Sequence, residues 1–338
     1  MAKPSSRPMP WEWALCDSGA MKDDAFPGTA FSRLARLQQT LLITWGLVLL
    51  VWVTWSAPRS FGLCVAGGLL LLGGHALILA MELACRVKVG GDETGTQPRA
   101  GELWRAWCHE SWLAVRVFAW QQPFRWTCCP DTTEQNHEGG PAVVMVHGFV
   151  CNRGFWLPWL TELRRRRIPY VTVNLEPVFG SIDDYIPLLD AAVRKAWALT
   201  GQAPVIVGHS MGGLAIRAWL ASASDHASRV RRVVTIGSPH AGTWLARWSR
   251  VPNGMQMRRH GRWLAELTHR EHAMRGAAAY SGFTCWYANT DNIVFPVATA
   301  TLPGADNRLV RGAPHVGLAY EPGILSDVIE QLGHGPDR

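Results

Sequence analysis

Two long apolar runs stand out near the start of the chain, at residues 37–58 and 60–81. Each contains 22 residues without Asp, Glu, Lys or Arg, and Arg59 alone separates them. A helix of about 20 apolar residues is long enough to cross the hydrocarbon core of a bilayer. A pair of buried helices in a soluble domain is the alternative, but residues 41–53 are apolar nearly all round rather than along one stripe. The pattern therefore predicts a transmembrane hairpin.

Basic residues flank this hairpin on both sides, whereas its loop contains only Arg59. The flanking residues are Lys22, Arg33, Arg36, Arg86, Lys88 and Arg99. Basic residues close to a span remain on the cytoplasmic side of the membrane. We therefore expect a multi-pass protein of a bacterial-type inner membrane, with a cytoplasmic tail at residues 1–36, the hairpin within 37–87 and the rest of the chain in the cytoplasm.

Residues 88–140 connect the hairpin to the remainder of the chain. A polar, glycine-rich stretch at 90–101 precedes a helical pattern at 102–121. Four tryptophans fall in that pattern, namely Trp104, Trp107, Trp112 and Trp120. A helix of this kind fits the headgroup region beside a membrane anchor. It fits packing against a folded domain equally well, because its apolar periodicity is imperfect.

From residue 141 onward, short apolar runs alternate with helical patterns. Strands are expected at 142–146, 170–174, 205–207, 231–237, 283–288 and 309–311, and helices at 156–167, 182–199, 214–224 and 260–272. This order is typical of an α/β domain with a mostly parallel sheet flanked by helices. Residues 141–338 are numerous enough to bury a full core. The insertion at 244–279 suits either a lid or a packed pair of helices.

Ser210 lies within the stretch Pro-Val-Ile-Val-Gly-His-Ser-Met-Gly-Gly, at residues 204–213. The flanking patterns place it on a turn between a buried strand and a helix. A chain that reverses within a few residues crowds its own backbone, and Gly208 and Gly212 relieve that crowding. In such a turn the serine hydroxyl points away from the sheet, where a substrate can reach it. A turn that only packs tightly is the alternative, but the flanking strand and helix favour a nucleophilic serine.

At this motif the sequence resembles the α/β-hydrolase superfamily, and within it the bacterial lipases and esterases that carry Gly-His-Ser-Met-Gly-Gly. The resemblance covers about residues 140–332 and does not extend to the N-terminal hairpin. It implies an α/β-hydrolase fold and a serine esterase that needs no cofactor and no metal. In the proteins it resembles, the loop after the first strand supplies one backbone N–H of the oxyanion hole, and the residue after the nucleophile supplies the other. Those donors are Phe149, in His147-Gly148-Phe149, and Met211.

The acid and the base follow from the chain order of this superfamily, which is serine, acid, histidine. Asp291 comes after a strand and precedes an apolar run and a proline, whereas Asp306 follows Pro303-Gly304-Ala305, a sequence typical of an exposed turn. His315 comes after the last expected strand. His240 also follows a strand, but the resembled families keep a histidine here that is not catalytic. We therefore predict a catalytic triad of Ser210, Asp291 and His315, with His147 supporting its loop.

The amino-acid composition limits the kinds of binding partner that we expect for this protein. Lys and Arg number 33 against 26 Asp and Glu, for a net charge of +7. The positive residues gather at the membrane flanks and at 164–167 rather than along an aromatic stripe, which argues against nucleic acid. Eight cysteines without a Cys-x-x-Cys pair favour reduced thiols over a metal site. The expected partners are the membrane and a lipid or small ester substrate.

Two alternatives to ester hydrolysis remain open. The same triad serves an acyltransferase, which passes the acyl group to an alcohol or amine, or a thioesterase. A membrane-bound binding module with an inactive serine turn is an alternative of another class. The presence of Ser210, Asp291 and His315 together argues against that second alternative.

Overall fold

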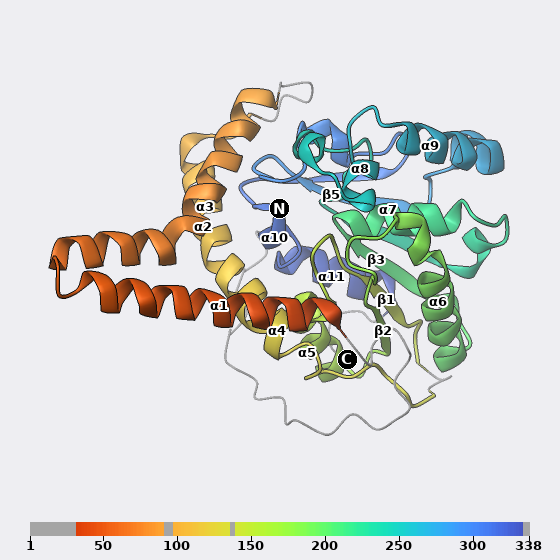
Figure 1. Ribbon diagram of the computed structural model, residues 1–338. Coiled ribbons are helices and arrows are strands. Elements are labelled where there is room, and N and C mark those ends of the chain that lie inside the picture. Colours follow the sequence, from red (N-terminus) through yellow and green to blue (C-terminus); the bar gives the residue numbers. More distant parts are fainter. Residues whose placement is uncertain (1–31, 91–96, 136–138, 334–338) are drawn as a thin grey trace, which may run out of the picture.

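The computed structural model describes residues 32–90, 97–135 and 139–333. Most of the tail expected at 1–36 lies outside the described residues, as do parts of the segment expected at 88–140. The described chain forms a helical hairpin, a further long helix and a domain built on one parallel sheet (Figure 1).

Six parallel strands form the sheet, in the order β2-β1-β3-β4-β5-β6. They are β1 (Val143–Val146), β2 (Tyr170–Val173), β3 (Val205–His209), β4 (Arg232–Ile236), β5 (Phe283–Ala288) and β6 (Asp306–Val310). The central strands β1 and β3 are buried along their whole length, as the continuous apolar runs of parallel strands require. The predicted α/β class with a mostly parallel sheet is confirmed.

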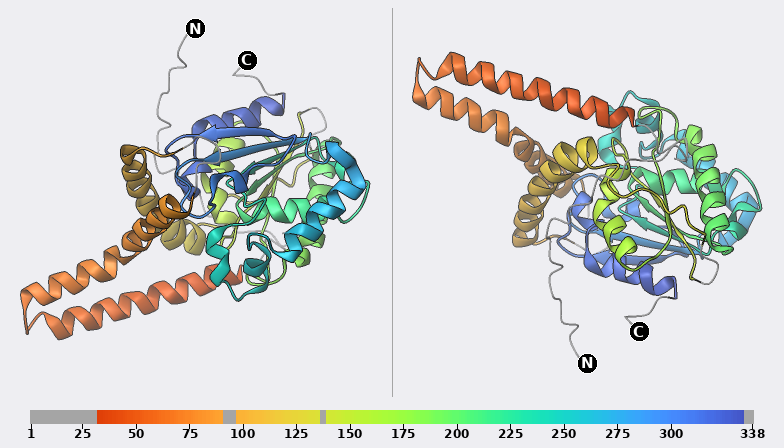
Figure 2. Two further views of the ribbon diagram at one scale, coloured as in Figure 1. Left: turned by 90° about the horizontal axis from the view of Figure 1, so that it is seen from above. Right: turned by 90° about the horizontal axis from the view of Figure 1, so that it is seen from below.

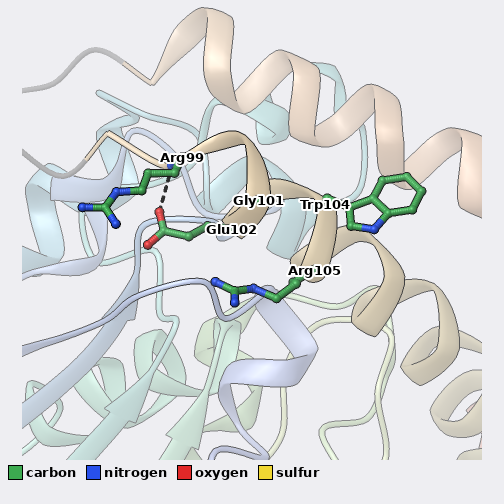
Figure 3. Close-up of a pocket in the computed structure, with 5 residues that line it drawn as sticks. All are labelled: Arg99, Gly101, Glu102, Trp104 and Arg105. Atoms are coloured by element: carbon green, nitrogen blue, oxygen red, sulfur yellow. Dashed lines mark hydrogen bonds between the residues drawn. The ribbon is translucent and has the colours of Figure 1, made fainter.

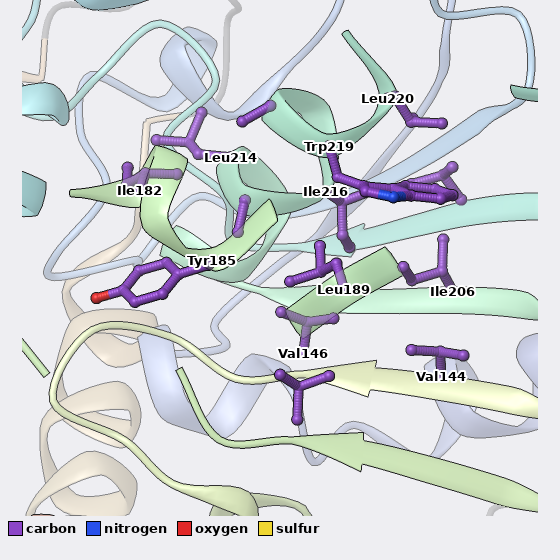
Figure 4. Close-up of a cluster of buried hydrophobic side chains, with 14 of the residues drawn as sticks. Val144, Val146, Ile182, Tyr185, Leu189, Ile206, Leu214, Ile216, Trp219 and Leu220 are labelled. Carbon is purple, nitrogen blue, oxygen red and sulfur yellow. The ribbon is translucent and has the colours of Figure 1, made fainter. Parts of the chain in front are cut away.

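Helices cover both faces of this sheet. The side chains of a strand point alternately to its two faces, so Val144 and Ile206 pack beneath α6 and α7, whereas Val143 and Val205 pack beneath α5 and α11. Figure 4 shows part of the first cluster. The helices of this domain are α5 (Leu157–Arg165), α6 (Ile186–Thr200), α7 (Met211–Leu220), α8 (Pro252–Gln256), α9 (Arg262–Arg275), α10 (His315–Leu318) and α11 (Pro322–Gln331).

The two apolar runs form α1 (Arg33–Ser56) and α2 (Phe61–Val89), a hairpin that projects from the rest of the molecule (Figures 1 and 2). Both helices are long and apolar enough to cross a membrane, and only 6% and 0% of their most apolar windows are buried. Val51 is 65% exposed and Leu69 is 67% exposed. Because soluble proteins rarely expose apolar surface on this scale, the two helices fit a membrane hairpin. The alternative of a buried helix pair is wrong.

The Trp-rich helix α3 (Ala100–Ala114) lies between the hairpin and the sheet domain (Figure 1). Ala106 and Leu113 are buried on the side that faces the protein, whereas Trp104 and Trp112 are 64% and 54% exposed. One face of α3 therefore packs against the sheet domain. The location of the exposed tryptophans at the membrane surface stays a prediction.

Helix α7 starts earlier than the sequence indicated. We expected a helix at 214–224, but α7 begins at Met211 and ends at Leu220. Glycine costs a helix about 1 kcal/mol relative to alanine, which made Gly212 a poor helical residue. A Cβ at position 212 would overlap the carbonyl oxygen of Val146. Close packing of the helix on the sheet thus outweighs local propensity.

Two other boundaries also differ from expectation. The helical pattern at 102–121 continues beyond α3 as a π-helical segment, Val115–Gln121, followed by the short α4 (Gln122–Phe124). Strand β6 begins at Asp306 rather than at residue 309, because residue 306 already pairs with Thr284 of β5. Pairing with a neighbouring strand is a tertiary contact that the local sequence pattern does not contain.

Candidate active site

Ser210 lies between the end of β3 and the start of α7, with φ of 53° and ψ of −126°. A positive φ is uncommon for a residue with a side chain and needs support from its surroundings. The surrounding glycines give that support, since a Cβ at Gly208 would lie 2.8 Å from the nitrogen of Gly213. The strand, turn and helix predicted around this serine are present in the structure.

The structure brings Ser210, His315 and Asp291 together. Nε2 of His315 lies 3.0 Å from Oγ of Ser210, and Nδ1 lies 2.9 Å from Oδ2 of Asp291. The three residues are 6%, 5% and 2% exposed. They form a continuous chain of hydrogen bonds from a carboxylate, through an imidazole, to a hydroxyl. Such a chain can remove the hydroxyl proton when the oxygen attacks a carbonyl carbon.

The Asp291 carboxylate is oriented by its own loop. Its other oxygen, Oδ1, accepts hydrogen bonds from the backbone N–H groups of Ile293 and Val294, both at 2.8 Å. One carboxylate oxygen is thus fixed by the backbone, and the other is free to bond the imidazole of His315. A base held in this way keeps a single tautomer and orientation.

The charges around His315 favour its protonated form. Burial alone lowers the pKa of His315, because water no longer solvates the cation. The Asp291 carboxylate raises it through charge and hydrogen bonding, the carboxylates of Glu110 and Glu82 add to this effect, and the net result is a raised pKa. An imidazolium formed during proton transfer is therefore stabilised by negative charge on more than one side.

The rival candidates lie elsewhere. Asp306 is exposed at the amino end of β6, where its carboxylate accepts a hydrogen bond from Arg308 at 2.8 Å. His240 is buried, and its Nε2 lies 3.0 Å from Oγ1 of Thr235. Neither side chain forms a hydrogen bond with Ser210 or His315 in the described part of the chain.

His147 occupies the position expected of a residue that supports its loop. Its Nε2 accepts the backbone N–H of Leu175 at 3.0 Å, so its Nδ1 carries the proton and donates to the carbonyl oxygen of Gly148 at 2.9 Å. Burial lowers the pKa of His147 to about 4. The ring is neutral at ordinary pH and links β1 to the chain that follows β2.

The two predicted oxyanion donors lie on segments that border the serine. Met211 is the first residue of α7, and the first N–H groups of a helix have no partner within that helix. Phe149 follows Gly148, where an added Cβ would lie 2.9 Å from Cβ of Ser210. The aromatic ring of Phe149 packs edge-on against Phe179, with ring centroids 6.0 Å apart. The segments that carry Phe149 and Met211 therefore border Ser210, and the role of their N–H groups as oxyanion donors stays a prediction.

Sequence reasoning missed two residues that hold His315. His209, directly before the serine, has its Nε2 3.2 Å from the carbonyl oxygen of His315, to which it donates. Asn292, directly after Asp291, accepts the backbone N–H of His315 at 3.2 Å. Both residues are adjacent in sequence to a predicted triad member, which is the only local signal for them.

Sequence reasoning also missed three glutamates of the N-terminal helices, Glu82, Glu102 and Glu110. All three form hydrogen bonds to the loops that carry Asp291 or to the residues that follow His315. Two local signals were available for these residues. Glu82 is a charged residue directly after an apolar run, and Glu110 is a carboxylate within a Trp-rich helix.

Two hollows lie outside this cluster of residues. One, of about 450 Å³, is at the start of α3 and is lined by Arg99, Glu102 and Arg105, with Trp104 farther along the helix (Figure 3). In Figure 3, the Glu102 carboxylate accepts the backbone N–H of Arg99, at 2.8 Å. The other, of about 880 Å³, is lined by α9, by the residues directly before that helix and by His240. Neither hollow is lined by the predicted triad.

Comparison with known proteins gives a consistent result. Residues 143–336, more than half of the chain, match the family described as the alpha/beta hydrolase family. The mature lipase BlEst2 of Bacillus licheniformis is 17% identical, with a TM-score of 0.50 over 60% of this chain and 95% of that one. Lipase B of Aspergillus fumigatus is 18% identical, with a TM-score of 0.52 over 63% of this chain and 58% of that one. At such identities the likeness shows the fold alone. No curated protein sequence matches the chain.

Proposed function

Because the chain belongs to the alpha/beta hydrolase family, we propose that it is a serine hydrolase that cleaves carboxylic esters. One observation carries this proposal: the hydrogen bonds of His315 to Ser210 and Asp291, at 3.0 and 2.9 Å. The similarity in fold to two lipases agrees with it. The alternative of an inactive binding module would not require this geometry.

The reaction begins with proton transfer to His315. Its Nε2 takes the proton of Ser210 as Oγ attacks the ester carbonyl carbon, and the negative charge on the carbonyl oxygen is stabilised by the backbone N–H groups of Phe149 and Met211. The C–O bond to the alcohol then breaks, and His315 returns the proton to the leaving alcohol oxygen. An acyl-enzyme on Ser210 remains.

Water completes the cycle. His315 takes a proton from a water molecule, the resulting hydroxide attacks the acyl carbon, and Oγ of Ser210 leaves and regains the proton from His315. The products are a carboxylic acid and an alcohol. Asp291 stays ionised throughout and stabilises the imidazolium that forms twice in each turnover.

The substrate is a lipid or another ester dissolved in the membrane. The exposed apolar surface of α1 and α2 supports anchoring in a bilayer. Glu82 directly follows the apolar run of α2 and accepts a hydrogen bond at 2.7 Å from Asn292, which in turn binds the backbone of His315. His315 is thus two hydrogen bonds away from the end of the apolar run in α2. The exposed Trp104 and Trp112 suit the headgroup region.

Covalent labelling tests this proposal directly. The full chain, purified in detergent, is treated with a fluorophosphonate probe and assayed against nitrophenyl esters of increasing acyl length. We expect labelling and hydrolysis by the unmodified protein and neither by Ser210→Ala. Absence of labelling in a folded, unmodified protein would favour the binding-module alternative. Adding a competing alcohol to the assay and identifying the products distinguishes hydrolysis from acyl transfer.

A further inference from the structure

Two loops carry the predicted acid and base, and they are joined to each other along their length. We call residues 289–292 the acid loop and residues 312–317 the base loop. Asn289 accepts the backbone N–H of Gly312 at 2.8 Å, and the hydroxyl of Thr290 donates to the carbonyl oxygen of Ala313 at 2.9 Å. The bonds of Asp291 and Asn292 to His315 complete this set. The distance between acid and base therefore depends on both loops together.

Three glutamates from outside the family domain hold these loops. Glu102 accepts a hydrogen bond from Asn289 at 3.1 Å, and Glu82 accepts one from Asn292 at 2.7 Å. Glu110 accepts the backbone N–H groups of Val316 and Gly317 at 2.9 and 3.2 Å. All three belong to α2 or α3, before the first residue of the matching family domain.

Glu110 is the most constrained of the three. Its side chain comes from α3, yet it caps the first turn of α10, which begins at His315 itself. It is 3% exposed, and burying a carboxylate is costly unless hydrogen bonds compensate. Burial raises the pKa of Glu110 to about 7, although the two N–H groups and the positive charge of His315 act in the opposite direction. The two accepted N–H groups offset part of that cost, because without Glu110 they would be buried without this acceptor.

We propose that Glu110 and Glu82 are positioning residues of the hydrolase, so that the N-terminal helices complete its active site. This inference rests on the proposed function. Glu110 fixes the turn that carries the base, and Glu82 fixes Asn292 and, through it, the backbone of His315. Loss of either bond lets the imidazole move relative to Ser210. A displacement of about 1 Å costs about 100-fold in rate.

The charge of Glu110 also acts on His315. Asp291, Glu110 and Glu82 favour the charged form of His315. The ring of His209 lies against that of His315, with centroids 4.7 Å apart, and the two rings disfavour each other's positive charge. Tyr320 interacts electrically with Glu110, and His109 lies beside Gly317. The pKa of Glu110 is about 7, so Glu110 and His315 titrate in the same range. The ionised carboxylate of Glu110 favours the imidazolium, so replacing it with a neutral group lowers the pKa of His315 to the extent that Glu110 is ionised there. The acidic limb of the pH profile of kcat/KM should then move to lower pH.

The test compares charge loss at Glu110 with charge loss at a distant site. The full chain in detergent is assayed with a short nitrophenyl ester from about pH 5 to about pH 9, values chosen to span the histidine range. The amide in Glu110→Gln offers one acceptor oxygen for two backbone N–H groups and places its own NH2 against the other. Glu110→Gln should therefore lower kcat by about 10-fold to about 100-fold, with little change in KM, and move the acidic limb downward. The matched control is Glu330→Gln, an exposed glutamate on α11, which should change neither quantity.

A second pair of variants keeps the test decisive if Glu110→Gln does not fold. Glu82→Ala removes the acceptor for Asn292, whereas Glu82→Gln retains a carbonyl oxygen in the same place. We expect Glu82→Ala to lose about 10-fold in kcat and Glu82→Gln to recover most of it. Equal activity of the two variants would contradict a role in positioning.

The outcomes separate this inference from the proposed function. If Ser210→Ala is inactive while folded Glu110→Gln and Glu82→Ala match the unmodified protein in kcat and pH profile, the inference is wrong and the proposed function stands. If Ser210→Ala is as active as the unmodified protein, the proposed function itself is wrong. Thermal unfolding of each variant, followed by circular dichroism, shows whether lost activity reflects an unfolded chain.

Discussion

Arg217 on α7 and Glu271 on α9 form a fully buried ion pair, with Nη2 and Oε2 2.6 Å apart and side chains 1% and 0% exposed. A second bond, from Nε to Oε1, makes the pair bidentate. The pair joins the helix that follows the predicted nucleophile to the insertion expected at 244–279. Any lid in this insertion must therefore open without separating α9 from α7.

Breaking this ion pair should destabilise the protein. Arg217→Met removes the bidentate partner of the buried Glu271 carboxylate and leaves it the longer ion pair with Arg275, at 4.0 Å. The loss should cost about 3 kcal/mol and lower the melting temperature by about 10 °C for a domain of this size. Thermal unfolding by circular dichroism measures the change. The double variant Arg217→Met, Glu271→Leu should recover part of the loss.

A surface ion pair on α9 provides the control for that experiment. Arg262 and Glu266 pair at 2.5 Å with side chains 92% and 52% exposed. Exposed pairs contribute about 0–1 kcal/mol, so Glu266→Gln should leave the melting temperature nearly unchanged. Equal shifts for Arg217→Met and Glu266→Gln would contradict the stabilising role of the buried pair.

Removing members of the predicted triad should give non-additive losses. Ser210→Ala and His315→Ala should each reduce kcat for a short nitrophenyl ester by about 10⁴-fold or more, and the double variant should be little worse. The physical reason is that neither group activates the nucleophile without the other. Losses that multiply in the double variant would mean that Ser210 and His315 act separately.

Asp291 and Asp306 can be compared by matched substitutions. Asp291→Asn removes the carboxylate that accepts from Nδ1 of His315 at 2.9 Å, and we expect kcat to fall by about 10⁴-fold. Asp306→Asn changes an exposed residue that bonds Arg308, so activity should persist. The opposite result would make Asp306 the acid.

The pH dependence of kcat/KM should show an acidic limb set by His315. The base works only when neutral, so activity rises as pH increases through its pKa, and the carboxylates of Asp291, Glu110 and Glu82 raise that pKa against the effect of burial. The residual activity of Asp291→Asn should therefore show a limb at lower pH. A limb that stays in place would indicate that another group titrates.

Membrane topology can be read from fusions at the C-terminus. Basic residues on both sides of the hairpin predict that residues 88–338 lie in the cytoplasm. Green fluorescent protein fused after Arg338 in a bacterial host should fluoresce, and alkaline phosphatase, which needs an oxidising compartment, should stay inactive. Strong phosphatase activity would place the catalytic domain and its substrates on the other side of the membrane.

The sequence by itself determined the features that rest on local patterns. The apolar runs at 37–58 and 60–81 were long enough to identify two candidate spans, and they correspond to α1 and α2. Alternating strand and helix patterns determined the α/β class, and the glycines around Ser210 determined its turn. Each signal lies within about 20 adjacent residues, where periodicity and backbone sterics act.

Only the tertiary structure decided which distant residues meet. Asp291 rather than Asp306 lies beside His315, because Asp291 and the base loop follow the carboxyl ends of the neighbouring strands β5 and β6, whereas Asp306 lies at the amino end of β6. Glu82 meets Asn292 across 210 residues of sequence, and Glu110 meets Val316 across 206. These contacts depend on how α2 and α3 dock on the sheet domain. No local propensity encodes such docking, because it follows from the burial of surfaces that are far apart in the chain.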